Sequence, residues 1–405
     1  MPTLDLRPMT LASSDTGTVV SCVDLMTNGH DGDFVRIYYP SANSNPSGSM
    51  RWFPPDNTNQ REHMPIPEGY TQGIASMGGA FVPLLGKWLM KHNWRKHRRV
   101  TVEIEWQQPL KGDSIKYPVI VISTGYGGTR FMQAGLSAAL VAQGFIVFAI
   151  EHGDGSCIWS YRSTHEVKWK VPRRTDVKNF RGEYFEPLIE QRARELLSAC
   201  ELVCKLNEGK LDKKDIHIGA GFDFVRYFTN RMQVDKLVVA GYSLGGPTVL
   251  RAIVNDSERR LIDKALLLDC TMFWMTEDYC KQVVECHRPL LFVNADIHHK
   301  REIERRMALM ALDADNVKMI TVKDTEHISF CEEGRIMPGW IGGPKLDNLE
   351  CEKLTAACAK EFYETSSPTN FPSDKLQSEF ASTLLVPVST KTEKALKHDQ
   401  TWKPY

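Results

Sequence analysis

After Pro118 the chain alternates short apolar runs, rich in β-branched residues, with segments of helical periodicity, and this alternation constrains the fold most. Strands of a parallel sheet are buried on both faces by helices, so they read as continuous apolar runs. Apolar spacing of three and four predicts a long helix around Leu188–Leu206. The pattern predicts six strands, at Val119–Ile122, Phe145–Ile150, Lys236–Ala240, Ala265–Leu268, Leu290–Val293 and Val317–Val322. The fold class is therefore α/β, with a mainly parallel central sheet and helices on both faces.

The two ends of the chain differ from this central pattern. Two β-rich runs, Thr18–Val23 and Phe34–Tyr39, flank the turn-forming sequence NGHDGD and predict an N-terminal antiparallel hairpin. A further strand is expected at Val100–Trp106. Residues 366–405 are rich in Ser, Thr, Pro and Lys, so we expect a weakly ordered C-terminal tail after a single domain of residues 1–365.

Composition excludes several classes of function. Lys plus Arg and Asp plus Glu both total 50, so the formal net charge is zero and no global field attracts nucleic acid. The N-terminal sequence lacks the apolar run of a secretory signal, and no apolar stretch suits a transmembrane helix, so a cytoplasmic or peripheral protein is expected. Ten cysteines without C-x-x-C pairs indicate reduced, mostly buried thiols rather than a metal site.

The segment KLVVAGYSLGGPTVLRAI carries the strongest chemical signal. A buried strand runs into Gly241, Tyr242, Ser243, Leu244 and Gly245 and then into a helix, which is G-x-S-x-G in its strand–turn–helix context. A nucleophile on so tight a turn needs glycine neighbours, because side chains there would clash. Ser243 is the predicted nucleophile.

A serine hydroxyl needs a histidine base, and the histidine needs an acid that holds its tautomer. In chain order the acid and then the histidine follow the serine, at strand ends. Asp269 directly follows the strand ALLL, and His327 follows VKMITV in the polar loop KDTEHISF. The weaker alternatives are Asp263 and Asp296 for the acid and, for the base, His287, His298 and His299, the last two also being poor metal ligands without partners.

Acyl transfer also requires two N–H groups for the oxyanion. Leu244, after the nucleophile, supplies the first, and Tyr126, in the glycine-rich turn of VIVISTGYGGTR, supplies the second. That turn lacks the G-K-[ST] ending of a phosphate-binding loop.

Motifs spread over roughly residues 18–335 resemble those of the platelet-activating factor acetylhydrolases of the plasma and intracellular type, calcium-independent phospholipases A2 on the α/β-hydrolase fold. They include VRIYYP, STGYGGTR, GFIVFAIEHGDGS, QRARELLSA, GYSLGG, LLLDCTMF and TEHISF. The resemblance implies a triad of Ser243, Asp269 and His327, oxyanion donors at Tyr126 and Leu244, a phospholipid substrate, and no metal or other cofactor.

The sequence departs from the family around the site. Tyr242 and Leu244 stand where the family usually has histidine and phenylalanine, and Thr124 replaces the usual histidine of the oxyanion turn. Backbone donors survive such changes, whereas the shape of the acyl pocket is less certain. His152 and Asp154, in EHGDGS, are expected to be structural elements near the site.

Aromatic and aliphatic residues gather before a basic run in GGAFVPLLGKWLMKHNWRKHRR. Such a segment suits a helix lying in a lipid interface, although the same residues could instead cover the sheet. The resemblance implies docking on lipid surfaces in this region. The residues concerned are Leu84, Leu85, Trp88, Leu89 and Met90.

The motifs thus predict a serine esterase, and the resemblance implies that its substrate is the short or oxidised sn-2 acyl ester of a phospholipid. A general carboxylesterase or neutral lipase would use the same residues. A catalytically silent hydrolase-fold protein that binds lipid is the alternative from another class, but its usual hallmark is a lost triad residue, and all three are present.

Overall fold

The computed structural model describes residues 17–27, 32–43, 104–158, 160–162, 165–167, 182–272, 275–296, 313, 315–335, 343–365 and 371–385. These residues build an 11-stranded sheet. Its strands are β1 (Val20–Thr27), β2 (Phe34–Pro40), β3 (Ile104–Trp106), β4 (Tyr117–Ser123), β5 (Ile146–Ile150), β8 (Ile216–Ile218), β9 (Met232–Tyr242), β10 (Ile262–Leu268), β11 (Leu290–Ala295), β12 (Val317–Val322) and β13 (Leu384–Leu385). β6 (Ser160–Arg162) and β7 (His165–Val167) form a separate pair.

The strand order is β13-β12-β11-β10-β9-β4-β5-β2-β1-β3, with β8 also paired to β1. The six strands predicted after Pro118 are β4, β5, β9, β10, β11 and β12, and they pair in parallel with one another. β1 and β2 form the predicted antiparallel hairpin, and β2 joins β5 in antiparallel fashion. Four short strands were not predicted: β8 and β13 of this sheet, and the separate pair β6 and β7.

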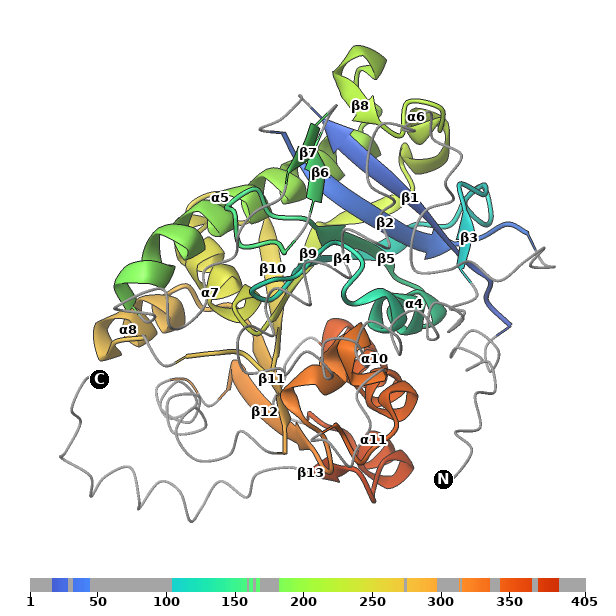
Figure 1. Cartoon of the computed structure of the whole chain (residues 1–405). Helices are drawn as coiled ribbons and strands as arrows, with labels where there is room; N and C mark the ends of the chain where they lie inside the picture. The colour runs from blue at the N-terminus through green and yellow to red at the C-terminus, as the bar shows by residue number, and fades with distance from the viewer. Residues whose placement is uncertain are drawn as a thin grey trace, which may run out of the picture.

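Helices cover both faces of this sheet, as Figure 1 shows for α5, α7 and α8 on one side and α4 and α10 on the other. Alternate residues of β4 point to opposite faces of the sheet. Val119 and Val121 belong to the hydrophobic cluster that includes α5, and Ile120 and Ile122 to the cluster that includes α4. The helices are α4 (Ala134–Ala142), α5 (Gly182–Asn207), α6 (Phe224–Phe228), α7 (Gly245–Asn255), α8 (Glu277–Glu285), α10 (Asn348–Glu364) and α11 (Asp374–Glu379), with 3-10 turns η3 (Lys213–Asp215), η4 (His327–Phe330) and η5 (Glu332–Arg335).

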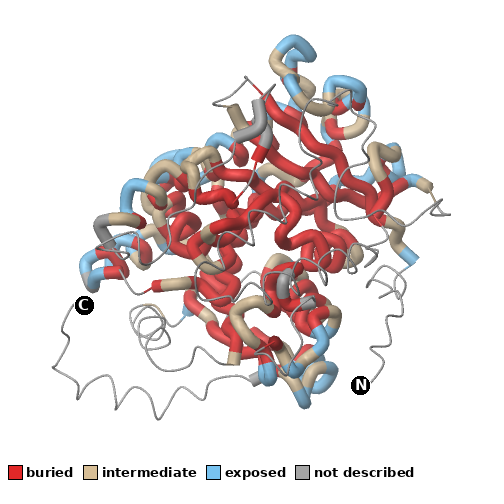
Figure 2. Tube along the Cα trace, viewed as in Figure 1, coloured by how far each residue is buried: buried red, intermediate tan, exposed pale blue. Residues whose placement is uncertain are grey.

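The central strands are buried on both faces, so the apolar runs of the sequence reflect burial, as expected (Figure 2). Order, direction and layers are those of the α/β-hydrolase fold, which confirms the predicted fold class. Within the part of the chain that the structure describes, no helix is long and apolar enough to cross a membrane.

The prediction of a weakly ordered tail from residue 366 is wrong for residues 371–385. This stretch forms α11 and β13, and β13 pairs with the edge strand β12. Phe371, Leu376 and Leu384 pack into the core, and Ser373 caps α11 through the Leu376 N–H. Apolar residues so widely spaced among polar ones leave no periodic signal in the sequence, which explains the error.

A buried ion network joins the N-terminal hairpin to the segment that carries the predicted oxyanion turn. Asp24 accepts hydrogen bonds from Arg36 at 2.7 Å and from Arg130 at 2.8 Å, and Arg130 also pairs with Glu151 at 2.6 Å. All four side chains are at most 3% exposed. The network fixes Arg130, six residues after Thr124, against the end of β5.

Candidate active site

The strand β9 and the helix α7 meet at a strained turn that holds Ser243. Its φ of 55° lies in the left-handed region, which a residue with a side chain adopts only under constraint. A Cβ on Gly241 would come within 2.2 Å of the Gly245 carbonyl oxygen, and one on Gly245 within 2.1 Å of the Ser123 carbonyl oxygen. Both glycines of the motif are therefore required by close approach of backbone, and the turn has the strained geometry expected of a nucleophile elbow.

Asp269 and His327 meet at the same edge of the sheet. Asp269 follows β10 with φ of 39°, and its Oδ1 accepts the Ala295 N–H at 3.0 Å. Its Oδ2 lies 2.5 Å from His327 Nδ1. Because a carboxylate only accepts, Nδ1 carries the proton and Nε2 is the basic nitrogen of the ring. The structure therefore pairs the predicted acid with the predicted base.

Contacts on either side of Ser243 bring the elbow to this pair. The Tyr242 ring stacks on the His327 ring with centroids 4.9 Å apart, and its hydroxyl donates to the His327 carbonyl at 3.0 Å. The Thr271 N–H, two residues after Asp269, donates to the Ser243 carbonyl at 3.2 Å. Tyr242 thus fixes one face of the histidine, a role that the motif alone did not reveal.

The predicted oxyanion turn lies against the elbow. A Cβ on Gly125 would lie 3.1 Å from Ser243 Cβ, so the backbone before Tyr126 is in contact range of the Ser243 side chain. The turn closes through the Gly128 N–H, which donates to the Gly125 carbonyl at 3.0 Å, and Gly127 pairs with the strand-like segment at Cys157. Tyr126 and Leu244 are therefore on the two backbone segments that flank Ser243.

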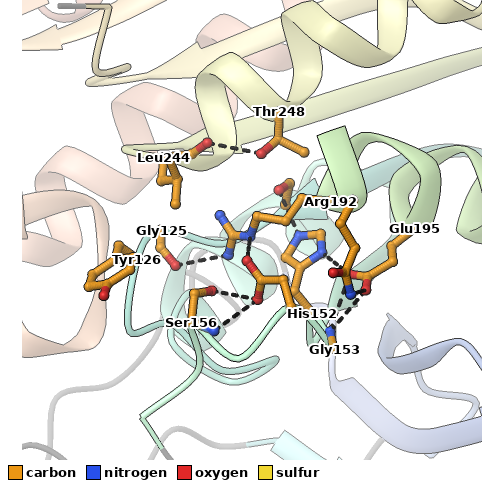
Figure 3. A network of polar contacts seen from close by, with 12 residues as sticks. Gly125, Tyr126, His152, Gly153, Ser156, Arg192, Glu195, Leu244 and Thr248 are labelled. Atoms are coloured by element: carbon orange, nitrogen blue, oxygen red, sulfur yellow. Dashed lines mark hydrogen bonds and ion pairs between the residues drawn. The ribbon is translucent and has the colours of Figure 1, made fainter. Parts of the chain in front are cut away.

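A second serine–histidine–acid relay lies close to the turn (Figure 3). His152 Nδ1 lies 2.7 Å from Glu195 Oε2, and His152 Nε2 lies 2.8 Å from Ser123 Oγ. Burial lowers the pKa of His152, and the Arg192 cation lowers it further. Ser123 is fully buried at the end of β4, so this relay braces the sheet and has no exposed nucleophile.

Sequence comparison now identifies the group of proteins to which this site belongs. The sequence model of the family described as "Platelet-activating factor acetylhydrolase, isoform II" matches residues 9–353. The chain belongs to the platelet-activating factor acetylhydrolase family. Family membership confirms the resemblance that the sequence motifs indicated.

Three proteins named platelet-activating factor acetylhydrolase illustrate the relationship. The protein of Cavia porcellus is 27% identical over 318 residues, 77% of this chain and 66% of its own length. The protein of Canis lupus familiaris is 27% identical over 347 residues, which are 82% of this chain and 70% of its own length. The protein of Bos taurus is 28% identical over 326 residues, which are 77% of this chain and 66% of its own length. The chain thus spans about two thirds of the length of these relatives.

A solved structure is similar to this acetylhydrolase family member in fold. It is a ferulic acid esterase from Streptomyces cinnamoneus, with a TM-score of 0.56, 14% sequence identity, and coverage of 88% of this chain and 91% of that one. So distant a likeness supports the α/β-hydrolase fold alone.

Two of the competing candidates in this acetylhydrolase family member lie at the opposite edge of the sheet from Asp269, whereas Asp296, directly after β11, lies at the same edge. Asp263 is near the start of β10, at the opposite end from Asp269, and His287 precedes β11. Asp296 Oδ2 accepts the Asp324 N–H at 2.9 Å. His298, His299 and the predicted lipid-interface residues at 84–90 lie outside the described residues. Among the described residues no group of three His, Cys, Asp or Glu side chains could hold a metal ion.

Sequence reasoning missed Arg192 and Glu195, which this family member places on α5 beside the site. Arg192 is fully buried, and its Nη2 donates to the Gly125 carbonyl at 3.1 Å. The one available signal was position: Arg192 falls between Ile189 and Leu196 on the apolar stripe of the helix. A charged residue on such a stripe needs a buried partner.

Proposed function

We propose that the protein is a serine esterase that hydrolyses the short or oxidised sn-2 acyl ester of phospholipids related to platelet-activating factor. Family membership supports the reaction class, and the relatives' names supply the substrate class. The observation that carries the mechanism is the 2.5 Å contact between His327 Nδ1 and Asp269 Oδ2 beside the strained Ser243 turn.

In the first half-reaction Ser243 Oγ attacks the sn-2 carbonyl carbon while His327 Nε2 takes its proton. Asp269 stabilises the resulting imidazolium and holds the ring in its tautomer. The tetrahedral intermediate collapses, and the leaving lysophospholipid oxygen receives the proton from His327. The products at this stage are a lysophospholipid and an acyl-enzyme on Ser243.

In the second half-reaction His327 takes a proton from water, which attacks the acyl carbonyl. Collapse of this second intermediate returns a proton to Ser243 and releases the carboxylic acid. In both intermediates the N–H groups of Tyr126 and Leu244 donate to the oxyanion, and loss of one such donor typically costs about 100- to 1000-fold in kcat.

An apolar cluster beside the elbow supports an acyl substrate. The Leu244 side chain packs with Phe185 and Ile189 at the start of α5, and Tyr126 and Tyr184 lie against the same group. Tyr126 and Tyr184 also share a hydrogen bond of 2.8 Å between their hydroxyls. The side chains of both proposed oxyanion residues thus belong to one apolar cluster next to Ser243, an environment that suits a hydrocarbon group better than a charged one.

Peripheral contact with a lipid surface is part of the proposal. Leu84, Leu85, Trp88, Leu89 and Met90 precede a basic run in the sequence, as in helices that lie in lipid interfaces. Burial of four such side chains at about 1.5 kcal/mol each would gain roughly 6 kcal/mol before entropic costs, which suits reversible binding. A cytoplasmic protein that visits membranes fits this arrangement.

The test measures release of the sn-2 acyl group from acetyl-glycerophosphocholine and from a long-chain analogue, with EDTA present. Wild type, Ser243→Ala and a Trp88→Ser, Leu89→Ser double variant are compared, the last also by sedimentation with phosphatidylcholine liposomes. We expect rapid release from the acetyl substrate alone, loss in Ser243→Ala, and weaker sedimentation of the double variant with unchanged hydrolysis of a soluble ester.

Equal rates on both substrates would replace the acetylhydrolase activity by a general esterase or lipase. No hydrolysis of any ester would contradict the enzyme and leave a lipid-binding protein. Unchanged sedimentation of the double variant would contradict the lipid interface.

A further inference from the structure

Arg192 lies beneath the oxyanion turn and is fully buried (Figure 3). Its Nη2 donates to the Gly125 carbonyl at 3.1 Å, and its Nε pairs with Asp154 Oδ2 at 3.2 Å. Asp154 is itself held by Ser156, whose N–H and hydroxyl donate to its Oδ1 at 3.0 and 2.7 Å. The guanidinium is therefore held by one hydrogen bond, to the Gly125 carbonyl, and by one ion pair, to Asp154, that lacks hydrogen-bond alignment.

The carbonyl that Arg192 binds belongs to the same peptide group as the Tyr126 N–H. A trans peptide is planar, and its C=O and N–H point in opposite directions. The Gly125 oxygen has two anchors, the Gly128 N–H at 3.0 Å within the turn and Arg192 from outside it, and together they set the direction of the Tyr126 N–H. Rotation of this peptide by even a few tens of degrees would misalign a donor whose geometry must suit the oxyanion.

The positive charge on Arg192 has a second consequence for the same peptide. A cation at the carbonyl oxygen draws electron density through the amide and strengthens the N–H as a donor, as in hydrogen-bonded chains that polarise one another. Asp154 balances the charge at the far side of the guanidinium, which makes a buried arginine tolerable here.

From this geometry we propose that Arg192 is a positioning residue for the oxyanion hole, aligning and polarising the Tyr126 N–H through the Gly125 carbonyl. The proposal rests on the proposed esterase function and adds a specific role for α5 in it. α5 has other attachments to the fold: Glu195 receives the Gly153 N–H at 3.2 Å, and Glu186 pairs with Arg251 of α7. Anchoring of the helix therefore does not depend on Arg192 alone.

The experiment compares Arg192→Met with the double variant Arg192→Met, Asp154→Asn. The single variant leaves a buried carboxylate without its cation, so it should lower the thermal midpoint. The double variant removes that unpaired charge and should recover much of the midpoint. If Arg192 positions the donor, kcat for a soluble acetyl ester falls about 10- to 100-fold in both variants while KM changes little, since the interaction is made in the transition state.

Binding of a trifluoromethyl ketone is the second readout. It forms a tetrahedral adduct with Ser243, so its affinity should fall by the same factor as kcat. Arg251→Met is the matched control, because it removes an arginine that anchors α5 without touching Gly125, and its kcat should remain within about threefold of wild type. If Arg192→Met does not fold, Arg192→Lys keeps a cation opposite Asp154, and we expect a three- to tenfold loss in kcat, about 1 kcal/mol.

Recovery of kcat together with the thermal midpoint in the double variant would overturn the proposal, as would an equal loss in Arg251→Met. If wild type is active, Ser243→Ala is inactive and Arg192→Met keeps the kcat of wild type, this inference alone is refuted. A wild type without esterase activity would refute the proposed function instead.

Discussion

Among the residues that the structure describes, two sets of serine, histidine and acid can be compared, and their residue chemistry is nearly the same. In one, Asp269 and His327 meet beside Ser243; in the other, Glu195 and His152 meet beside Ser123. The imidazole Nδ1 lies 2.5 Å from its carboxylate in the first and 2.7 Å in the second. The hydrogen-bond distance between histidine and acid therefore does not distinguish the proposed catalytic set from the structural one.

The two sets differ in the backbone conformation of the serine and in the solvent exposure of the serine and histidine. Ser243 has a φ of 55° on a turn between strand and helix, whereas Ser123 is the last residue of β4 and completely buried. The His327 side chain is 29% exposed and that of His152 only 1%. A nucleophile needs solvent access and a backbone that presents its hydroxyl, and of these two sets only the first combines a partly exposed serine with a strained turn.

The largest expected effect comes from exchanging each serine for alanine. Ser243→Ala should lower kcat by about 10,000-fold or more, since the nucleophile is lost. Ser123→Ala should keep kcat within about tenfold, while the loss of a buried hydrogen bond lowers the free energy of unfolding by about 1–3 kcal/mol. Hydrolysis of a soluble acetyl ester and urea unfolding measure the two quantities.

Labelling with a fluorophosphonate is the control for this pair of variants. The reagent should mark wild type and Ser123→Ala but not Ser243→Ala. A label on Ser123 in the Ser243→Ala protein would show that the second relay is reactive and would contradict the comparison.

Replacing the two acids by their amides should give a smaller difference in kcat between the two sets than replacing the serines. Asp269→Asn is expected to lower kcat about 1000- to 10,000-fold, because the amide favours the wrong tautomer of His327. Glu195→Gln should change kcat no more than about fivefold and lower the free energy of unfolding by about 1–2 kcal/mol, since Glu195 also receives the Gly153 N–H. Steady-state kinetics measure kcat for each variant, and urea unfolding measures the free energy of unfolding. A loss in kcat of Glu195→Gln larger than fivefold would make the second relay part of catalysis.

The first set could be predicted from the sequence because each member follows a strand. G-x-S-x-G is a local motif, and in a parallel sheet the residues after each strand collect at one edge, so Asp269 and His327 were predictable from chain order. The second set comes from three different kinds of position: Ser123 ends β4, His152 follows β5, and Glu195 lies within α5. No local pattern joins them, and contacts between the sheet and α5 bring them together.

The same limit applies to the fold. The central strands were predictable because burial on both faces makes them apolar throughout, and β12 was predicted with its observed bounds. β13 has only two residues, and its place at the sheet edge depends on pairing with β12. Arg192 and Asp154 likewise required the three-dimensional structure, because an ion pair across 38 residues leaves no periodic trace in the sequence.

The smallest expected effect is the pH dependence of the stability that His152 contributes. Because burial and Arg192 lower the pKa of His152 from 6.5, the unfolded chain binds its proton more readily than the folded one. The stabilisation by neutral His152 is therefore full above about pH 6.5 and declines as the pH falls, by at most about 1.4 kcal/mol per pH unit. Urea unfolding from pH 5 to 8 should show wild type more stable than His152→Gln at pH 8, with a gap that narrows toward pH 5. Other histidines cancel in this difference, so a gap independent of pH would mean that His152 is not held neutral by its surroundings.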